Sequence, residues 1–96
     1  MTVVGRDRLD DFCAKHPGAR SWIENWLADA EAASWATPHV LKARYPSASF
    51  LGGGATIFNV KGNDCRLEVT VAYKTGTVVV LWIGTHAEYD ERNKKR

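Results

Sequence analysis

The side chains best suited to chemistry lie in the second half of the chain. Histidine can give or take a proton near neutral pH, and His86 is followed by Tyr89 one helical turn later. Arg66 carries a permanent charge on a planar fork that suits the oxygens of a phosphate. Together with Lys61, these residues could transfer protons and hold a phosphate group, provided that the fold brings them together.

Three β-strands are expected to position these residues. Segments rich in Val, Ile, Thr and aromatic residues, as is typical of strands, cover residues 56–61, 65–73 and 77–85. Gly62-Asn63 and Thr75-Gly76 lie between them as natural hairpin turns. Residues 3–4 suggest one more short strand, and residues 47–54, with three glycines, a loop or a loosely paired edge.

Helices are expected in the first half of the chain. One helix ends before Pro17, and a second follows with apolar residues at helical spacing up to Ala30. Thr37 is a suitable N-cap for a third, short helix over residues 39–44. The sequence therefore predicts an α+β fold in which N-terminal helices pack on a small antiparallel sheet.

The first predicted hairpin gathers polar side chains on one face of the sheet. With Gly62-Asn63 as a two-residue turn, Asn59 lies opposite Arg66, and opposite residues share a face. Lys61 falls on this face as well. The other face is apolar and is expected to pack under the helices, with Phe58, Val60, Cys65, Leu67, Val69 and Val71.

The second predicted hairpin brings the histidine to the same place. If Thr75-Gly76 forms a similar turn, Arg66 lies opposite Thr85, and His86 and Tyr89 follow at the rim. Such a set of groups suits RNA cleavage by the ribose 2′-hydroxyl, which needs a base, an acid and cations for the phosphorane charge, but no metal. The histidines and cysteines show no metal-ligand spacing, so neither a metal nor another cofactor is expected.

Length and composition predict a single domain over residues 1–96, with residues 91–96 as a frayed basic tail. The net charge of +2 is too small to indicate a nucleic-acid partner by itself. No apolar run could span a membrane, and no secretion signal is visible. Cys13 and Cys65 are expected to be reduced and buried, so the protein is expected to be cytoplasmic and not membrane-bound.

Three stretches resemble the HigB toxin family in order and spacing: Phe58-Asn59-Val60-Lys61-Gly62-Asn63, Arg66-Leu67 and Gly84-Thr85-His86-Ala87-Glu88-Tyr89-Asp90. The similarity runs from about Arg8 to Asp90. The resemblance implies a RelE-like fold and a type II toxin that cleaves mRNA, commonly during translation. It also implies neutralisation by a HigA-like antitoxin with a helix-turn-helix.

The resemblance further implies roles for individual residues. Arg66, His86 and Tyr89 match the family's catalytic groups, with Asp90 beside them. His86 would transfer a proton, Arg66 and Lys61 would hold the phosphate charge, and Tyr89 would stack on a base or supply a proton. The residues expected to bind RNA are Asn59, Lys61, Asn63, Arg92 and Lys94.

Two other interpretations remain open. Lys61 and Arg66 could simply form surface ion pairs with Asp64 and Glu68. Some relatives carry an arginine on the last strand where this chain has Leu81. The chain could therefore be a non-catalytic module on the same fold that binds RNA or the antitoxin and acts mainly in corepression.

Overall fold

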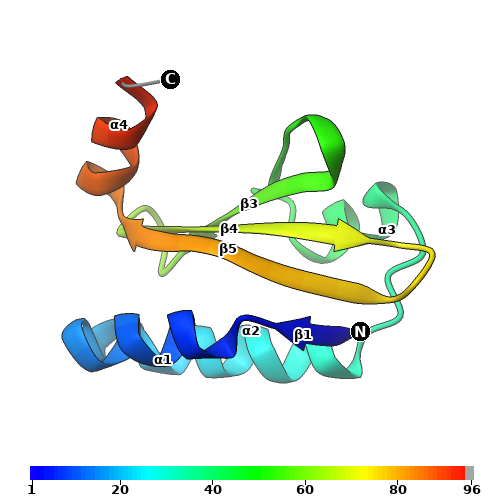
Figure 1. Cartoon of the computed structure of the whole chain (residues 1–96), viewed down its shortest axis with the longest axis horizontal. Helices are drawn as coiled ribbons and strands as arrows, with labels where there is room; N and C mark the ends of the chain where they lie inside the picture. The colour runs from blue at the N-terminus through cyan, green and yellow to red at the C-terminus, as the bar shows by residue number, and fades with distance from the viewer. Residues whose placement is uncertain (95–96) are drawn as a thin grey trace.

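The first two helices cover one face of a single sheet, as Figure 1 shows for the computed structural model, which describes residues 1–94. Helices α1 (Arg6–Lys15) and α2 (Arg20–Ala32) are joined by the 3-10 turn η1 (Pro17–Ala19). Helix α3 (Pro38–Arg44) begins after Thr37, whose hydroxyl accepts a hydrogen bond of 3.2 Å from the N–H of Val40. The three helices expected in the first half are therefore confirmed.

The sheet has the strand order β1-β5-β4-β3-β2. Its strands are β1 (Thr2–Val4), β2 (Ser49–Phe50), β3 (Ala55–Val60), β4 (Cys65–Ala72) and β5 (Thr77–Thr85), with the 3-10 turn η2 (Gly52–Gly54) between β2 and β3. β1 runs parallel to β5, whereas the other neighbours are antiparallel. The fold is α+β as expected, but the sheet is mixed and not purely antiparallel, because the chain returns to the edge beside β1 in the same direction.

The core lies between the sheet and helices α1 and α2. All six side chains expected on the apolar face are buried. The ring of Trp26 on α2 meets Phe58 on β3 edge-on, with 5.5 Å between the ring centroids. Such aromatic pairs contribute about 0.5–1.5 kcal/mol beyond the area that they bury. This packing leaves the other face of the sheet for function.

The register of the first hairpin is confirmed, but its turn is longer than expected. Asn59 pairs with Arg66, and Ile57 pairs with Glu68. The strands stop at Val60 and Cys65, so the turn comprises residues 61–64, and Lys61 adopts a left-handed conformation with φ of 51°. Strand alternation therefore ends before Lys61.

The predicted register of the second hairpin is wrong by one residue. Arg66 pairs with Gly84, and Thr85 pairs with Cys65 on the helix-covered face. The connection between β4 and β5 comprises four residues, 73–76, and Leu81 is an extra residue in β5 at a β-bulge. The longer turn and the β-bulge together change which side chains of β5 lie beside Arg66. We call the face away from α1 and α2 the outer face; it carries Asn59, Arg66, Glu68, Trp82 and Gly84.

Helix α4 (His86–Lys94) follows β5 directly and rises on the side of the sheet away from α1 (Figure 1). Residues 91–94 of the expected frayed tail belong to this helix, whereas residues 95–96 lie outside the described residues. A capping box starts the helix: the N–H of Glu88 donates to the hydroxyl of Thr85 at 3.2 Å, and the N–H of Thr85 donates to the Glu88 carboxylate at 2.8 Å.

A buried ion pair holds α4 on the outer face. Arg92 lies 2.6 Å from the carboxylate of Glu68, which is only 5% exposed. The guanidinium also lies over the ring of Trp82, 4.9 Å from the ring centroid. A Cβ atom at Gly84 would come within 2.6 Å of the Trp82 ring, so the indole requires a glycine at this position. These contacts fix α4 beside Arg66.

The capping box makes the stability of α4 depend on pH. The hydrogen bond from the backbone of Thr85 lowers the pKa of Glu88 from its usual 4.5. A carboxylate with a lowered pKa stabilises the folded state above its unfolded pKa, and this contribution is lost as the pH falls through the folded value. We expect Glu88→Gln to lower the free energy of unfolding, measured by urea denaturation at pH 7, by about 0.5 kcal/mol relative to the wild type. We expect this difference to shrink at pH 3.

The matched control is Glu91→Gln, because Glu91 lies on the same helix and only approaches Lys94 at 3.9 Å. It should change the free energy of unfolding little at either pH. A Glu88→Gln deficit of the same size at pH 7 and pH 3 would contradict the assignment.

Candidate active site on the outer face

Arg66 lies at the end of β4, with its charge on the outer face. Its guanidinium donates hydrogen bonds to both oxygens of Asn63, at 3.3 Å to the carbonyl and 3.2 Å to the side chain. It also donates to the carbonyl of Cys65 at 3.1 Å and lies 5.9 Å from the ring centroid of Tyr89. Within residues 1–94, Arg66 forms no ion pair, so its charge is not neutralised by a carboxylate.

His86 is the first residue of α4 and is held at two points. Its backbone N–H donates to the carbonyl of Asp64 at 2.9 Å, which ties the helix start to the β3–β4 turn. Its Nδ1 lies 2.9 Å from the carboxylate of Asp90, one turn later. The side chain is 45% exposed. With Nδ1 directed at Asp90, Nε2 is the nitrogen that remains for a substrate.

Tyr89 links these two residues in space. It follows His86 by three positions on α4, so the two side chains are neighbours on the helix surface. Its ring lies beside Arg66 and also 6.0 Å from Trp82. The three residues expected to be catalytic therefore lie at one end of the outer face. Within residues 1–94, no contact between His86 and Arg66 is found, whereas Tyr89 contacts Arg66 directly.

Asn59 and Asn63 lie beside Arg66 as well. Asn59 is its direct partner across β3 and β4, and Asn63 accepts its two hydrogen bonds from the turn. Because Arg66 can only donate, it fixes the Asn63 amide with the oxygen toward the guanidinium and leaves the NH₂ group free to donate elsewhere.

Lys61 does not share the outer face, contrary to the sequence prediction. A Cβ atom built on Gly18 would lie 3.1 Å from Lys61 Nζ, so this ammonium lies beside η1 on the helix-covered side. There it lines a cavity with Lys15, His16 and Asp64. The left-handed backbone at Lys61 is the reason, because it ends the alternation that would have kept the side chain beside Arg66.

The two basic residues of α4 differ in their surroundings. Arg92 is held between Glu68 and Trp82, so its charge already has a partner in the protein. Lys94 is exposed and, among residues 1–94, approaches only Glu91, at 3.9 Å. Of the two basic residues of α4 expected to bind RNA, Arg92 is therefore the one with a clear structural role.

Sequence reasoning missed the support that Glu68 and Trp82 give to the site. Glu68 was expected on the outer face, but nothing in its neighbourhood along the chain signals that it is buried. The signal for the role of Trp82 is its place two positions before Gly84, since a glycine in a strand can mark close approach by another group.

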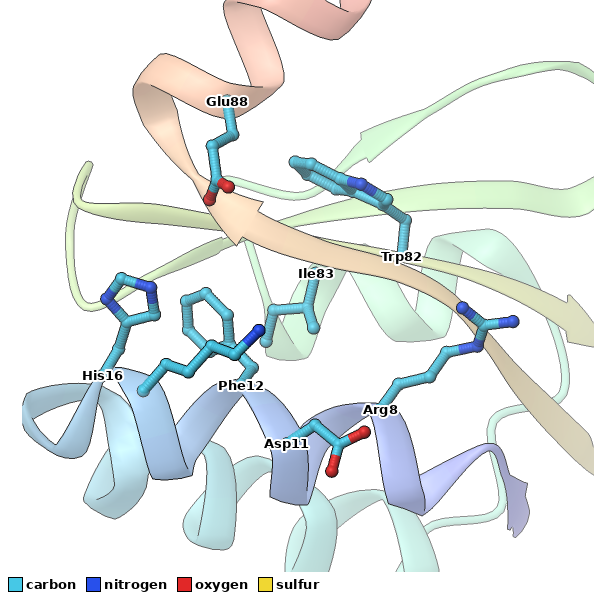
Figure 2. A pocket seen from close by; sticks show the side chains of 8 residues that line it. Arg8, Asp11, Phe12, His16, Trp82, Ile83 and Glu88 are labelled. Carbon is cyan, nitrogen blue, oxygen red and sulfur yellow. The ribbon is translucent and has the colours of Figure 1, made fainter.

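A separate cavity of about 270 Å³ lies between α1 and α4, beside β5 (Figure 2). Figure 2 shows Phe12, Asp11 and His16 on α1 and its C-terminal end, with Glu88 reaching down from α4. Trp82 points away from α1 toward α4. The cavity contains none of the residues expected to be catalytic, and its Glu88 carboxylate serves the helix cap.

The described residues offer little for other kinds of chemistry. Between residues 1 and 94, no group of three or more His, Cys, Asp or Glu side chains could hold a metal ion. Cys13 and Cys65 are free and buried, and burial raises the pKa of both thiols, so they stay protonated. In the same part of the chain, no helix is long and apolar enough to cross a membrane.

Comparison with known proteins gives the family. The model of the HigB toxin family, described as the RelE-like toxic component of a toxin-antitoxin system, matches residues 19–92. This region includes α2, the whole antiparallel part of the sheet and most of α4. A search among curated proteins found no match. Because the match covers well over half of the chain, this protein belongs to the HigB toxin family.

Proposed function

We propose that this toxin is an endoribonuclease that cleaves messenger RNA during translation in the cytoplasm. The observation that carries the proposal is the grouping of Arg66, Tyr89 and His86 at one end of the outer face, next to the Asn63 amide, whose oxygen binds Arg66. A permanent cation beside a proton-transfer group is what phosphodiester cleavage requires.

The proposed reaction is attack by the ribose 2′-hydroxyl on the adjacent phosphorus. The 2′-oxygen loses its proton and bonds to phosphorus, while the bond to the 5′-oxygen breaks and that oxygen gains a proton. The products are a 2′,3′-cyclic phosphate and a 5′-hydroxyl, and no metal takes part. Arg66 stabilises the extra negative charge of the phosphorane, for which its uncompensated guanidinium is suited.

His86 and its neighbours supply the proton transfers. Asp90 binds Nδ1 at 2.9 Å, so the imidazole is oriented with Nε2 toward the substrate. Tyr89, with its ring beside Arg66, either stacks on a base or supplies the second proton. Asn59 and Asn63 bind the RNA next to the cut, and the exposed Lys94 binds a more distant phosphate.

Membership of the family implies an antitoxin partner. We propose that this partner is a HigA-like protein with a helix-turn-helix, which neutralises the toxin by binding it. The part of this proposal that concerns the antitoxin does not depend on catalysis.

One observation favours a second candidate function, a non-catalytic module that binds RNA or the antitoxin and acts in corepression. Of the cations expected beside Arg66, Lys61 lies at η1 and Arg92 is paired with Glu68. Leu81, where some relatives have an arginine, is an exposed residue of the bulge. Arg66 would then be the principal charge for the phosphate, and cleavage tests decide between the two functions.

Replacement of the proposed catalytic residues tests the enzyme directly. We expect Arg66→Ala and His86→Ala to lower the rate of RNA cleavage at least ~100-fold each, because a charge donor and a proton-transfer group are lost. The measurement is growth after induction without the antitoxin, with mapping of new 5′-hydroxyl ends within messages. Lys74→Ala, an exposed cation on the β4–β5 connection, is the matched control and should remain toxic.

Both variants should keep the thermal unfolding midpoint and antitoxin affinity of the wild type, since both side chains are partly exposed. Full toxicity of both would remove the proposed site. Growth arrest by the wild type without any new 5′-hydroxyl ends would favour the non-catalytic module.

Asp90 is expected to be a positioning residue for His86. We expect Asp90→Ala to lower kcat about 10- to 100-fold with little change in KM, because the imidazole loses its orientation and not its contact with RNA. Asp90→Asn, which keeps a hydrogen-bond acceptor, should recover part of this loss. Glu91→Ala on the same helix serves as the control. Equal effects on kcat and KM, or no rescue by asparagine, would argue against this role.

A further inference from the structure

A pocket of about 460 Å³ lies on the other side of the β3–β4 turn from Lys61, at the edge of the sheet. Strand β2 pairs with β3 only at Ile57 and Thr56, so residues 58–60 have no partner strand on that side. Asn59 and Asn63 line the pocket together with Trp22, Tyr45, Arg44 and Pro46. None of these residues belongs to the proposed catalytic group, but Asn63 contacts Arg66 directly.

The charged group and the phenol hydroxyl of this pocket are already engaged. Asp29 accepts a hydrogen bond of 2.6 Å from the hydroxyl of Tyr45 and lies 3.1 Å from Nε of Arg44. Burial and the contact with Asp29 raise the pKa of Tyr45, so its hydroxyl stays neutral. Because Asp29 compensates the charge of Arg44, the pocket is not a site for a phosphate.

Two amides remain unsatisfied at the rim. Asn63 gives its oxygen to Arg66 and keeps both N–H donors. The Asn59 side chain, half-buried on β3, has no hydrogen-bond partner within residues 1–94. The Asn59 amide offers a donor and an acceptor side by side, and the Asn63 amide offers its N–H donors, which match polar groups at the edge of a nucleobase.

Trp22 completes the pocket with an aromatic surface. It is half-buried on α2 and lines the same pocket as the two amides. Single-stranded RNA is recognised through bases that leave the stack, lie on aromatic rings and bind polar groups at their edges. A pocket whose one cation is paired with Asp29, and which offers an indole, the free Asn59 amide and the NH₂ group of Asn63, provides both kinds of contact.

We propose that this pocket binds one unstacked nucleobase of the RNA, next to the phosphate held by Arg66. The inference rests on the proposed function, because it assumes an RNA on the outer face. Asn63 belongs to both sites, so a base that binds its NH₂ group also fixes the loop that holds Arg66. Base identity at this position is therefore expected to affect kcat as well as affinity.

The test is a scan of a short RNA in which each base in turn is removed to leave an abasic nucleotide. Binding is measured by fluorescence anisotropy on full-length His86→Ala, so that no cleavage occurs. One abasic position beside the mapped cut should weaken binding about 5- to 150-fold, as expected for a lost base–aromatic stack. When Trp22→Leu or Asn59→Ala is added to His86→Ala, the protein should bind the intact RNA more weakly. In these double variants, the abasic nucleotide at that one position should weaken binding much less than it does in His86→Ala alone.

Asn25→Ala is the matched control, because Asn25 is an exposed amide on the same helix as Trp22. It should keep the full abasic penalty. Trp22→Leu retains an apolar side chain for the core, and Asn59→Ala tests the pocket independently if Trp22→Leu does not fold. An unchanged penalty in both folded variants would overturn the proposal, as would a loss of antitoxin affinity in both with RNA binding intact.

The outcome is separable from that of the enzyme. The scan uses a protein that does not need to cut RNA, and it covers every position of the oligonucleotide. A wild type that cuts no RNA, with a position-specific penalty that the pocket variants abolish, would reject the endoribonuclease and keep the base pocket. Cleavage of RNA by the wild type without any position-specific penalty would keep the endoribonuclease and reject the base pocket.

Discussion

A single buried carboxylate helps to determine where the candidate site of this toxin is assembled. Glu68 lies almost fully buried in the middle of the sheet, and a buried charge needs a partner of opposite charge. Arg92 provides it from the last turns of α4, so the C-terminal helix is held over the outer face and not released into solvent. Together with the capping box and the hydrogen bond from His86 to Asp64, this contact positions the residues that α4 carries, Tyr89 included.

The indole of Trp82 fills the space beneath the same helix. It lies between Arg92 and Tyr89, and it fits only because residue 84 has no side chain. The bulge at Leu81 turns Trp82 toward Glu68. A bulge, a glycine and a buried acid thus act together to present Tyr89 to Arg66. One face of the sheet stabilises the fold through its packing on α1 and α2, while the other keeps polar groups accessible.

The β3–β4 turn connects three surroundings within four residues. Asp64 accepts a hydrogen bond from the start of α4, Asn63 holds Arg66, and Lys61 turns away toward η1. The proposed base pocket and the proposed cleavage site meet at this turn, because Asn63 lines the pocket and contacts Arg66. A substrate that contacts the turn would therefore influence binding and chemistry at the same time. This arrangement gives a small domain a way to couple recognition to cleavage without a moving part.

The sequence by itself determined the α+β class, the three N-terminal helices, the buried face of the sheet and the pairing of Asn59 with Arg66. These features follow from the spacing of apolar residues and from one short turn, which act over a few neighbouring positions. The family also followed from local motifs around Arg66 and His86.

Only the tertiary structure decided the parallel β1, the place of Lys61, the register beside Arg66 and the role of Arg92. Each depends on an event that local patterns do not encode: a left-handed residue that ends the alternation, an extra residue in β5, or an ion pair between positions 24 residues apart. A shift of one residue in a strand moves every following side chain to the other face. For that reason the residues of the proposed site could be named from the sequence, whereas their arrangement in space could not.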